Sequence, residues 1–440
     1  MISYATRIAL IAALGGFLFG FETAVISGAE GTIQHVWSLD SFWLGFTVAS
    51  SLIGTVIGSL IIGGITQLNG RRTVLLGIAI VYLLSAIGCA VTSQWIIFVL
   101  FRFLGGLAVG ASSVVGPMYI SEISPAESRG RLAGLFQLNI VGGILVAYLT
   151  NYLLSGFGGE DSWRYMLGIM AVPALIFAVL LNFIPESPRW LVLKGRDQEA
   201  TKIFHKLGQM GAVELIKEEH ELAMNGVKER LFNGKYNKPI FYAILLAMFN
   251  QLSGINAILY YAPRIFEMAG FDKADAFQQS VYVGLANFIF TALAMTVIDK
   301  FGRKKLLLIG AAGMVLFLSL TAFSFSDPLV ADRKVIYYLI GFIAFFAFSQ
   351  GAVIWVFISE IFPNAVRSQG GSLGSFTHWI MAAIISWVFP VIVEGNVLGG
   401  YYSFIFYAVM MFLSFLFIWR VMPETKGKTL EQIQKELGIK

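Results

Sequence analysis

The sequence predicts an all-α membrane protein with twelve transmembrane helices, and composition is the first reason. Of the 440 residues, 57% are hydrophobic and 13% are charged, whereas soluble proteins carry about 25% charged residues. The mean hydropathy is +0.76. A chain this apolar has more apolar surface than the cores of a soluble protein of this size can bury. Since a bilayer span takes about 20 apolar residues, the excess supplies roughly twelve spans.

Apolar windows between charged or Gly/Pro-rich breaks place these spans in two groups of six. The first group lies near residues 7–28, 42–66, 73–92, 95–119, 132–156 and 164–184. The second group lies near residues 239–262, 277–298, 304–325, 335–358, 370–392 and 399–421. No cleavable signal peptide is expected, because the first apolar run is too long and has no small-residue cleavage site.

The distribution of positive charge predicts the orientation. Of the 31 lysines and arginines, 25 fall on the side of the spans that holds both termini. The positive-inside rule places that side in the cytoplasm. The net charge of +5 is therefore interpreted as a topology signal and not as a nucleic-acid surface.

Four segments follow from this layout. Residues 1–184 form an N-terminal six-helix bundle, 185–238 a cytoplasmic linker, 239–422 a C-terminal six-helix bundle, and 423–440 a cytoplasmic tail. The linker mixes acidic and basic residues, and its stretches 198–207 and 212–222 read as short amphipathic helices on the cytoplasmic surface.

Three loop motifs recur in both halves in the same order. The first-half copies are GRRTVLL at 70, SEISPAESRGR at 121 and PESPR at 185, and the second-half copies are GRKKLLL at 302, SEIFPNAVRSQ at 359 and PETKG at 423. Nearly constant offsets indicate duplicated six-span halves of equal orientation. Such halves suit alternating access, with a central site opening to either side in turn.

With these motifs, the chain resembles the sugar porters of the major facilitator superfamily, from about residue 15 to 428. Further shared motifs are RFLGGLAVG at 102, PMYISE at 117, QLSGINAILYYAP at 251 and DKFGRK at 299. The resemblance implies the major facilitator fold and a bacterial proton-coupled monosaccharide transporter, similar to xylose and glucose symporters, in the cell inner membrane. Short termini and the absence of a glycosylated first loop fit a bacterium.

Two ionisable residues lie deep in the spans, Glu22 in the first and Arg102 in the fourth. A charge within the bilayer costs roughly 2.5 to 3.5 kcal/mol on insertion scales, so we infer that the two form a pair. In proton-coupled sugar porters an Asp stands at the position of Glu22 and pairs with the Arg, which implies proton coupling. The alternative is a fixed ion pair that fastens two helices. Some relatives carry a second acid where Met170 stands here, so a simpler proton path is expected.

Amide and aromatic side chains within the spans suit a sugar, because amides match hydroxyl groups and rings cover C–H faces. By resemblance, the sugar-contacting positions are Gln137, Asn250, Gln251, Asn256, Tyr260, Asn287, Trp355, His378 and Trp379. For each amide the alternative is an interhelical hydrogen bond; for His378 the alternatives are a proton relay or packing. Gly254 and Pro263 are expected to let the seventh span unwind and aim its amides inward.

Charged residues at the cytoplasmic helix ends occupy duplicated positions. In the family such residues form salt bridges between the halves, and the matching positions are Glu122, Arg129, Glu186, Arg189, Asp299, Arg303, Glu360, Arg367 and Glu424. We expect a cytoplasmic gate that favours the outward-facing state, the alternative being solvated charges of the positive-inside pattern. Gln67 stands where the first copy of one motif has Asp in the family, so the first-half gate is expected to be weaker.

The predicted function is import of a hexose or pentose together with a proton. A sugar uniporter is the near alternative and a transporter-like sensor a remote one, since the chain ends soon after Met422. No enzyme is expected, because no nucleophile–base set appears. The one cysteine and the histidine spacing predict no metal site, and no nucleotide-binding loop is present. The expected partners are a sugar, a proton and the lipid bilayer, with no cofactor, no nucleic acid and a monomeric state.

Overall fold

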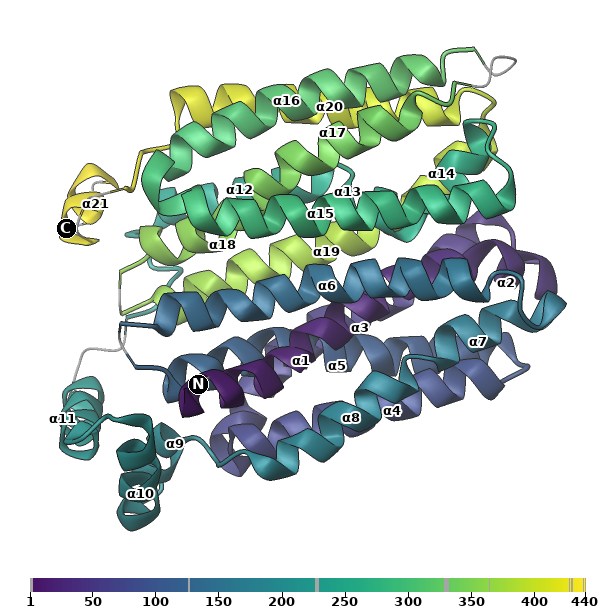
Figure 1. The fold of residues 1–440 in the computed structure, drawn as a ribbon. Coiled ribbons are helices and arrows are strands. Elements are labelled where there is room, and N and C mark those ends of the chain that lie inside the picture. The colour runs from purple at the N-terminus through teal and green to yellow at the C-terminus, as the bar shows by residue number, and fades with distance from the viewer. Residues whose placement is uncertain are drawn as a thin grey trace. The chain divides into compact units, whose positions relative to one another are not determined.

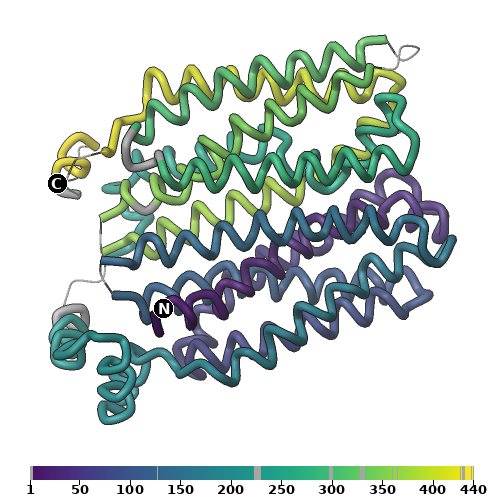
Figure 2. The backbone as a smooth tube through the Cα atoms, viewed as in Figure 1, coloured from purple at the N-terminus to yellow at the C-terminus, as the bar shows by residue number. Residues whose placement is uncertain are grey.

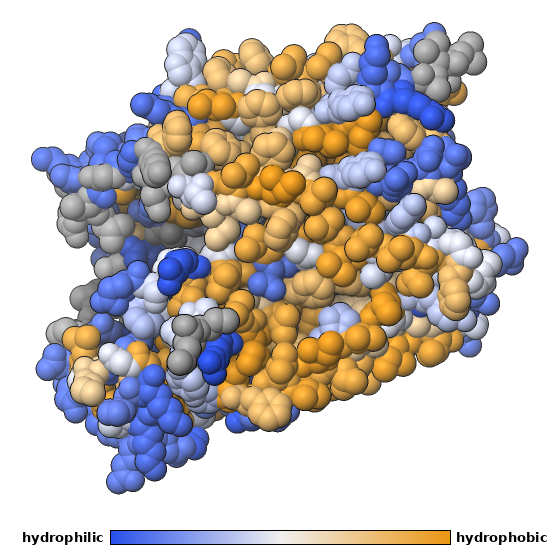
Figure 3. All heavy atoms as spheres, in the orientation of Figure 1, coloured by the Kyte–Doolittle hydropathy of each residue, from blue (hydrophilic) through white to orange (hydrophobic). Residues whose placement is uncertain are grey.

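In the computed structural model, the described part of the chain is helical and contains twelve helices long and apolar enough to cross a membrane. The structure describes residues 3–125, 127–225, 229–327, 332–363, 365–426, 428, 430–437 and 439. On the face drawn in Figure 3, hydrophobic side chains cover the middle of the helices, and hydrophilic ones gather toward the helix ends. The predicted all-α membrane fold with twelve spans is confirmed.

The observed spans match the predicted windows to within a few residues. The first-half elements are α1 (Tyr4–Val25) with η1 (Ile26–Gly28), α3 (Ser41–Asn69), α4 (Arg71–Val91), α5 (Trp95–Ile123), α6 (Arg129–Leu154), and the sixth span built from η2 (Gly159–Asp161), α7 (Ser162–Gly168), α8 (Ala171–Leu180) and η3 (Leu181–Phe183). The second-half elements are α12 (Asn237–Leu252) with α13 (Ile255–Tyr260), α15 (Lys273–Phe301), α16 (Arg303–Ser324), α17 (Val335–Phe348) with α18 (Gln350–Ile361), α19 (Arg367–Gly395) and α20 (Gly399–Arg420). Figure 1 labels them along the chain.

Shorter helices connect and extend the spans. They are α2 (Glu30–Val36), α9 (Pro188–Leu193), α10 (Asp197–Leu207), α11 (Ala212–Asn225), α14 (Ala262–Met268) and α21 (Leu430–Leu437). The two amphipathic helices expected in the linker are α10 and α11, and their apolar sides share a small core with α9 that includes Val192, Phe204 and Ile216. Helices α2, α9, α14 and α21 had no counterpart in the prediction.

The chain divides into two compact units whose boundaries do not follow its midpoint. Unit 1 comprises Met1–Thr23, Ile53–Ala147 and Arg164–Lys228; unit 2 comprises Ala24–Leu52, Tyr148–Trp163 and Glu229–Lys440. Two segments of the first half of the chain therefore belong with the second half. The predicted boundaries at 184, 238 and 422 stay a prediction.

Within unit 1, α4 packs along both α5 and α8. Helices α9 to α11 lie beyond the ends of these spans, as the teal part of the trace in Figure 2 shows. Helix α9 begins with Pro188 in its first turn and is capped by the Ser187 hydroxyl, which accepts from the backbone N–H of Trp190 at 3.2 Å. Proline at a first turn and serine at an N-cap are favourable, which explains the start of this helix.

Within unit 2, α16 packs along α20 and α17, while α12 packs along α19 and α15 along α17. A second core closes one end of the unit. There the tail residues Ile433 and Leu437 pack with Tyr236 and Phe362. The amphipathic helix α21 is thus held by apolar contacts with the ends of the spans, including α18.

Candidate functional site

The seventh span is interrupted where the sequence predicted. Helix α12 ends at Leu252, Gly254 adopts a left-handed φ of +82°, and α13 begins at Ile255. A Cβ on Gly254 would lie 2.3 Å from a ring carbon of Tyr407. Both the backbone conformation and the close packing therefore require glycine here. A second interruption at Tyr261 precedes α14, whose first turn contains Pro263.

This interruption brings the amides of the seventh span into one hydrogen-bonded cluster. The Gln251 amide donates to Asn250 Oδ1 at 3.0 Å and lies 3.0 Å from His378 Nε2, while Asn256 donates to Gln251 Oε1 at 2.8 Å. These four side chains are at most 8% exposed. Residues from α12, α13 and α19 thus form a buried polar patch, which we call the amide cluster (Asn250, Gln251, Asn256 and His378).

Two indole rings flank the amide cluster. The ring centroid of Trp355 lies 4.9 Å from that of His378, and Trp379 lies 4.8 Å away on an edge-to-face contact. Trp379 is buried, whereas Trp355 is 37% exposed. The arrangement offers neutral hydrogen-bonding groups beside an accessible aromatic face, which is the chemistry of carbohydrate binding.

No hydrogen bond described in the structure joins the other predicted sugar-contacting residues to the amide cluster. Tyr260 is buried at the end of α13, and Asn287 is buried on α15, where it accepts from Thr291 at 3.4 Å. Gln137 is half-buried on α6 and belongs to unit 1. The role of these three in binding stays a prediction.

Gln350 is a buried residue of this site that the sequence reasoning missed. Its backbone carbonyl oxygen accepts from Asn250 Nδ2 at 3.3 Å, and its side-chain Nε2 donates to Ser414 Oγ at 3.4 Å. It follows Ser349, where φ of −122° and ψ of −87° separate α17 from α18. The available signal in the sequence was an amide residue within an apolar span. Its backbone helps to orient the amide cluster.

The inferred pair of buried charges forms within unit 1. Arg102 Nη1 donates to Glu22 Oε1, and the two side chains are 1% and 5% exposed. Gly105 lies one turn along α5 from Arg102 and leaves room for the Glu22 carboxylate. A Cβ at this position would lie only 3.0 Å from Glu22 Oε1. Arg102 Nε and Nη2 are buried without a partner among the described residues. Such a pair is costly to bury and more costly to break by removing one partner.

In each unit, a copy of the repeated motifs builds an ion network at one end of that unit's helices. We call this the basic end of the unit, since it carries the arginines of the GRR motif in unit 1 and of the GRK motif in unit 2. In unit 1, Arg71 donates to both oxygens of Glu122 at 2.8 and 2.9 Å, and Glu186 accepts from the backbone N–H of Arg71 and Arg72 at 2.8 and 3.0 Å. Ser187 completes this network by donating to Glu122 at 2.5 Å.

Unit 2 repeats each part. Arg303 donates to Glu360 at 2.9 Å, Glu424 accepts from the backbone N–H of Arg303 and Lys304 at 3.0 and 3.1 Å, and Thr425 donates to Glu360 at 2.6 Å. In both networks a glutamate caps the N-terminus of the helix that follows the motif glycine, where backbone N–H groups lack partners. Residues at equivalent positions of the repeat therefore have equivalent partners in the two units.

The other predicted gate residues have different surroundings. Arg189 pairs with Glu219 at 2.8 Å on the surface, Arg129 is exposed at the start of α6, and Arg367 donates to the Phe362 carbonyl at 3.4 Å. The side chain of Asp299 lies outside the described part of the structure. Arg71, the central residue of the first network, was missed as a gate residue, because two adjacent arginines do not reveal which one faces inward. Pairing across the halves stays a prediction.

Twelve apolar spans, duplicated halves and a buried polar site define a multi-pass membrane transporter. Residues 8–437 match the family described as "Sugar (and other) transporter", and this chain belongs to that family. It is 38% identical to the arabinose-proton symporter of Bacillus subtilis over 99% of this chain and 95% of that protein. It is 37% identical to the D-xylose-proton symporter of Escherichia coli over 98% of this chain and 95% of that protein.

A solved structure shares the fold. The inward-open conformation of the xylose transporter XylE from E. coli matches with a TM-score of 0.87 and 35% identity, over 98% of this chain and 100% of that one. The predicted membership among the sugar porters of the major facilitator superfamily is confirmed.

Proposed function

We propose that this chain is a secondary active transporter that imports a monosaccharide, a hexose or a pentose, together with a proton. Similar proteins are named as arabinose-proton and D-xylose-proton symporters and as a glucose transport protein of Synechocystis, which is 35% identical. The single observation that carries proton coupling is the buried pair of Glu22 and Arg102. A carboxylate held by one arginine can bind a proton in one state of the transporter and release it in another.

Sugar binding is assigned to the amide cluster with Trp355 and Trp379. Neutral amides and a histidine can both donate to and accept from sugar hydroxyls. Each group is already held by neighbours, for example Asn256 by Gln251 at 2.8 Å, which reduces the ordering cost of binding. In this proposal the sugar binds in unit 2 and the proton binds to Glu22 in unit 1. Alternating access must link these two events.

The basic end is proposed to face the cytoplasm, with both termini on that side, by the positive-inside rule. The network around Glu122 lies at the basic end of unit 1, and the network around Glu360 lies at the basic end of unit 2. Together with the remaining charges of the repeated motifs they are proposed to form the cytoplasmic gate. The bacterial cytoplasmic membrane is the proposed location, given the bacterial relatives.

Uptake into proteoliposomes tests the proposal. With an inward gradient of about one pH unit, one proton per sugar supports about tenfold accumulation, because one pH unit is worth about 1.4 kcal/mol. We expect this from the wild type with arabinose, xylose or glucose as probe. Glu22→Gln should abolish accumulation but retain exchange of labelled for unlabelled sugar.

Glu218→Gln is the matched control, since it removes one carboxylate from the exposed face of α11. It should accumulate sugar as the wild type does. If the wild type only equilibrates sugar whatever the gradient, the chain is a uniporter and the Glu22–Arg102 pair is structural. If neither exchange nor accumulation of these sugars occurs, the proposed substrate class is wrong.

A further inference from the structure

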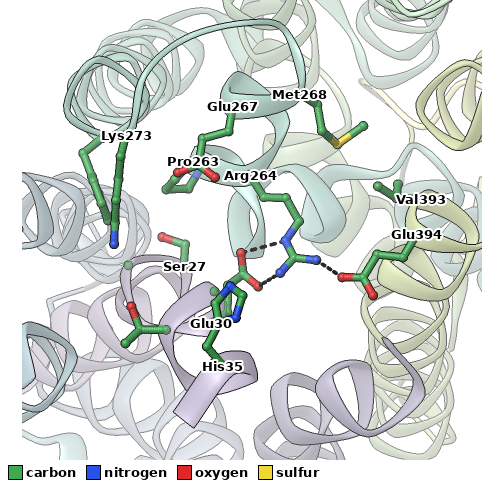
Figure 4. A pocket seen from close by; sticks show the side chains of 14 residues that line it. Ser27, Glu30, His35, Pro263, Arg264, Glu267, Met268, Lys273, Val393 and Glu394 are labelled. Carbon is green, nitrogen blue, oxygen red and sulfur yellow. Dashed lines mark hydrogen bonds and ion pairs between the residues drawn. The ribbon is translucent and has the colours of Figure 1, made fainter. Parts of the chain in front are cut away.

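At the end of unit 2 opposite its basic end, one arginine gathers acidic and amide groups from distant parts of the chain. Arg264 on α14 donates through Nε to Glu30 Oε1 at 3.0 Å, and its Nη2 lies 2.7 Å from Glu30 Oε2. Its Nη1 donates to Glu394 at 2.5 Å and its Nη2 to Gln34 at 2.6 Å. Figure 4 shows the guanidinium between the two carboxylates.

The partners come from both halves of the sequence. Glu30 and Gln34 lie one turn apart on α2, directly after the first span, whereas Arg264 lies on α14, directly after the seventh span, and Glu394 lies at the end of α19, the eleventh span. Gln34 also donates to Glu394 at 2.8 Å. The described contacts therefore tie the end of the first span to two spans of the second half through one guanidinium.

The cluster is shielded from water more than a surface ion pair is. The side chains of Glu30 and Arg264 are 4% and 14% exposed, and that of Glu394 is 33% exposed. Exposed ion pairs contribute about 0 to 1 kcal/mol to stability. A buried guanidinium whose three nitrogens all have partners is much harder to separate from its carboxylates.

Other contacts join the same parts of unit 2. The Tyr148 hydroxyl donates to the Leu259 carbonyl at 2.7 Å, and Trp387 Nε1 donates to the Phe42 carbonyl at 3.1 Å. Gly45 packs so closely that a Cβ would lie 2.1 Å from the Trp387 carbonyl oxygen. This face of unit 2 is therefore closed by direct contacts between first-half and second-half segments.

We propose that Glu30, Arg264 and Glu394 form an ionic latch that holds the external end of the transporter closed and must separate each time the site opens outward. This inference rests on the proposed function. Arg264 is a positioning residue: it lies four residues beyond Tyr260 on the segment that carries Asn256. Movement of that segment during sugar binding therefore acts directly on the latch.

A cavity of about 440 Å³ beside the latch gives access to it. The charged and titratable groups that line this cavity with Glu30 are Arg264 and Glu267 on α14, Glu394 on α19, Lys273 on α15, and His35 on α2 itself. The phenol of Tyr261, just before α14, also interacts electrostatically with Glu30. Burial raises the pKa of the Glu30 carboxyl, although Arg264 opposes this. A raised pKa means that acidification removes the charge of Glu30 sooner than that of an ordinary glutamate, so acid on the outside weakens the latch.

Distances between spin labels test the latch directly. Labels on cysteines at Val36 and Val397, both exposed, in a Cys89→Ala background report the separation of α2 from the end of α19. We expect one short distance in the wild type. Arg264→Gln should increase the population at long distance relative to the short one by about tenfold, as a two-state equilibrium responds to the loss of a favourable contact in one state.

Three further variants make the test specific. Exchanging the charges in Glu30→Arg with Arg264→Glu should restore the short distance, which a general loss of folding would not allow. Glu267→Gln is the control, because Glu267 lines the same cavity and lies on the same helix as Arg264. The ion pairs described for Arg264 are with Glu30 and Glu394. Glu267→Gln should therefore leave the distances unchanged. Acidification should lengthen the distance in the wild type but not further in Glu30→Gln.

The latch is overturned if Arg264→Gln leaves the distance distribution of the wild type unchanged, or if the exchanged pair stays open. These outcomes are independent of the proposed function. A protein that fails to accumulate sugar but shows the expected distances disproves symport and keeps the latch. A protein that accumulates sugar normally with unchanged distances in the variants disproves the latch alone.

Discussion

At the scale of single residues, the cost of burying polar groups is what made the site predictable. Glu22 and Arg102 were paired from sequence because no other opposite charge was available to either at that depth, and the structure has them in contact. Arg71 and Gln350 were not foreseen. Their roles depend on helix phase and on a backbone carbonyl, which residue type alone does not encode.

His378 lies between Gln251 of the amide cluster and the two indole rings, and its hydrogen bonding can be separated from its packing. His378→Phe keeps a ring between Trp355 and Trp379 but removes the nitrogen that lies 3.0 Å from Gln251. We expect sugar affinity to fall about tenfold, equivalent to about 1.4 kcal/mol, with the proton-to-sugar ratio unchanged. Isothermal titration of purified protein and accumulation assays measure the two quantities.

Thr377→Val is the control for this substitution, because Thr377 is equally buried on the same helix but donates to the Leu373 carbonyl of its own helix at 2.9 Å. It should bind sugar with nearly unchanged affinity. Should His378→Phe bind sugar normally but lose accumulation, the histidine is a proton relay and not a sugar ligand.

At the scale of elements, glycine and proline marked one helix break but not the other. The interruption of the seventh span was predicted from Gly254 and Pro263, since each disfavours a continuous helix. The break at Ser349 carries no proline, and it depends on tertiary packing: a Cβ on Gly310 would lie 1.8 Å from Ser349 Oγ. Helices α2 and α21 were missed because each is at most eight residues long, too short for a periodic pattern.

Gly254 provides a test of whether the helix break is required. Gly254→Ala places a Cβ 2.3 Å from the Tyr407 ring. It also puts an alanine at a backbone φ of +82°, which strains the backbone. We expect a clear loss of thermal stability, more than the roughly 1 kcal/mol that left-handed strain alone costs, and loss of sugar binding. Differential scanning fluorimetry and titration with sugar give both results.

Gly208→Ala is its matched control. Gly208 has φ of +72° at the end of α10, but nothing lies within 4 Å of an added Cβ. It should show the strain cost alone and bind sugar normally. Equal effects of the two substitutions would mean that packing against Tyr407 does not hold the break in place.

At the scale of the whole molecule, composition and the loop repeats predicted the fold, and long-range pairing escaped prediction. Apolar windows gave all twelve spans because the bilayer fixes their length. The repeat predicted duplicated charged positions at the helix ends, and in the structure Glu186 and Glu424 are matching helix caps, each within its own unit. The contact of Arg264 with Glu30 joins residues 234 positions apart, and no local pattern reports such a pair.

The single cysteine makes the orientation of the molecule testable. Cys89 is buried in the third span, so a Cys89→Ala background accepts single reporters. Val397 is 83% exposed beyond α19, and Met210 is 78% exposed between α10 and α11. If the basic end faces the cytoplasm, a membrane-impermeant maleimide should label Val397→Cys on intact cells and Met210→Cys only after the cells are opened. Labelling of Met210→Cys on intact cells would invert the orientation and with it the assignment of the latch to the external side.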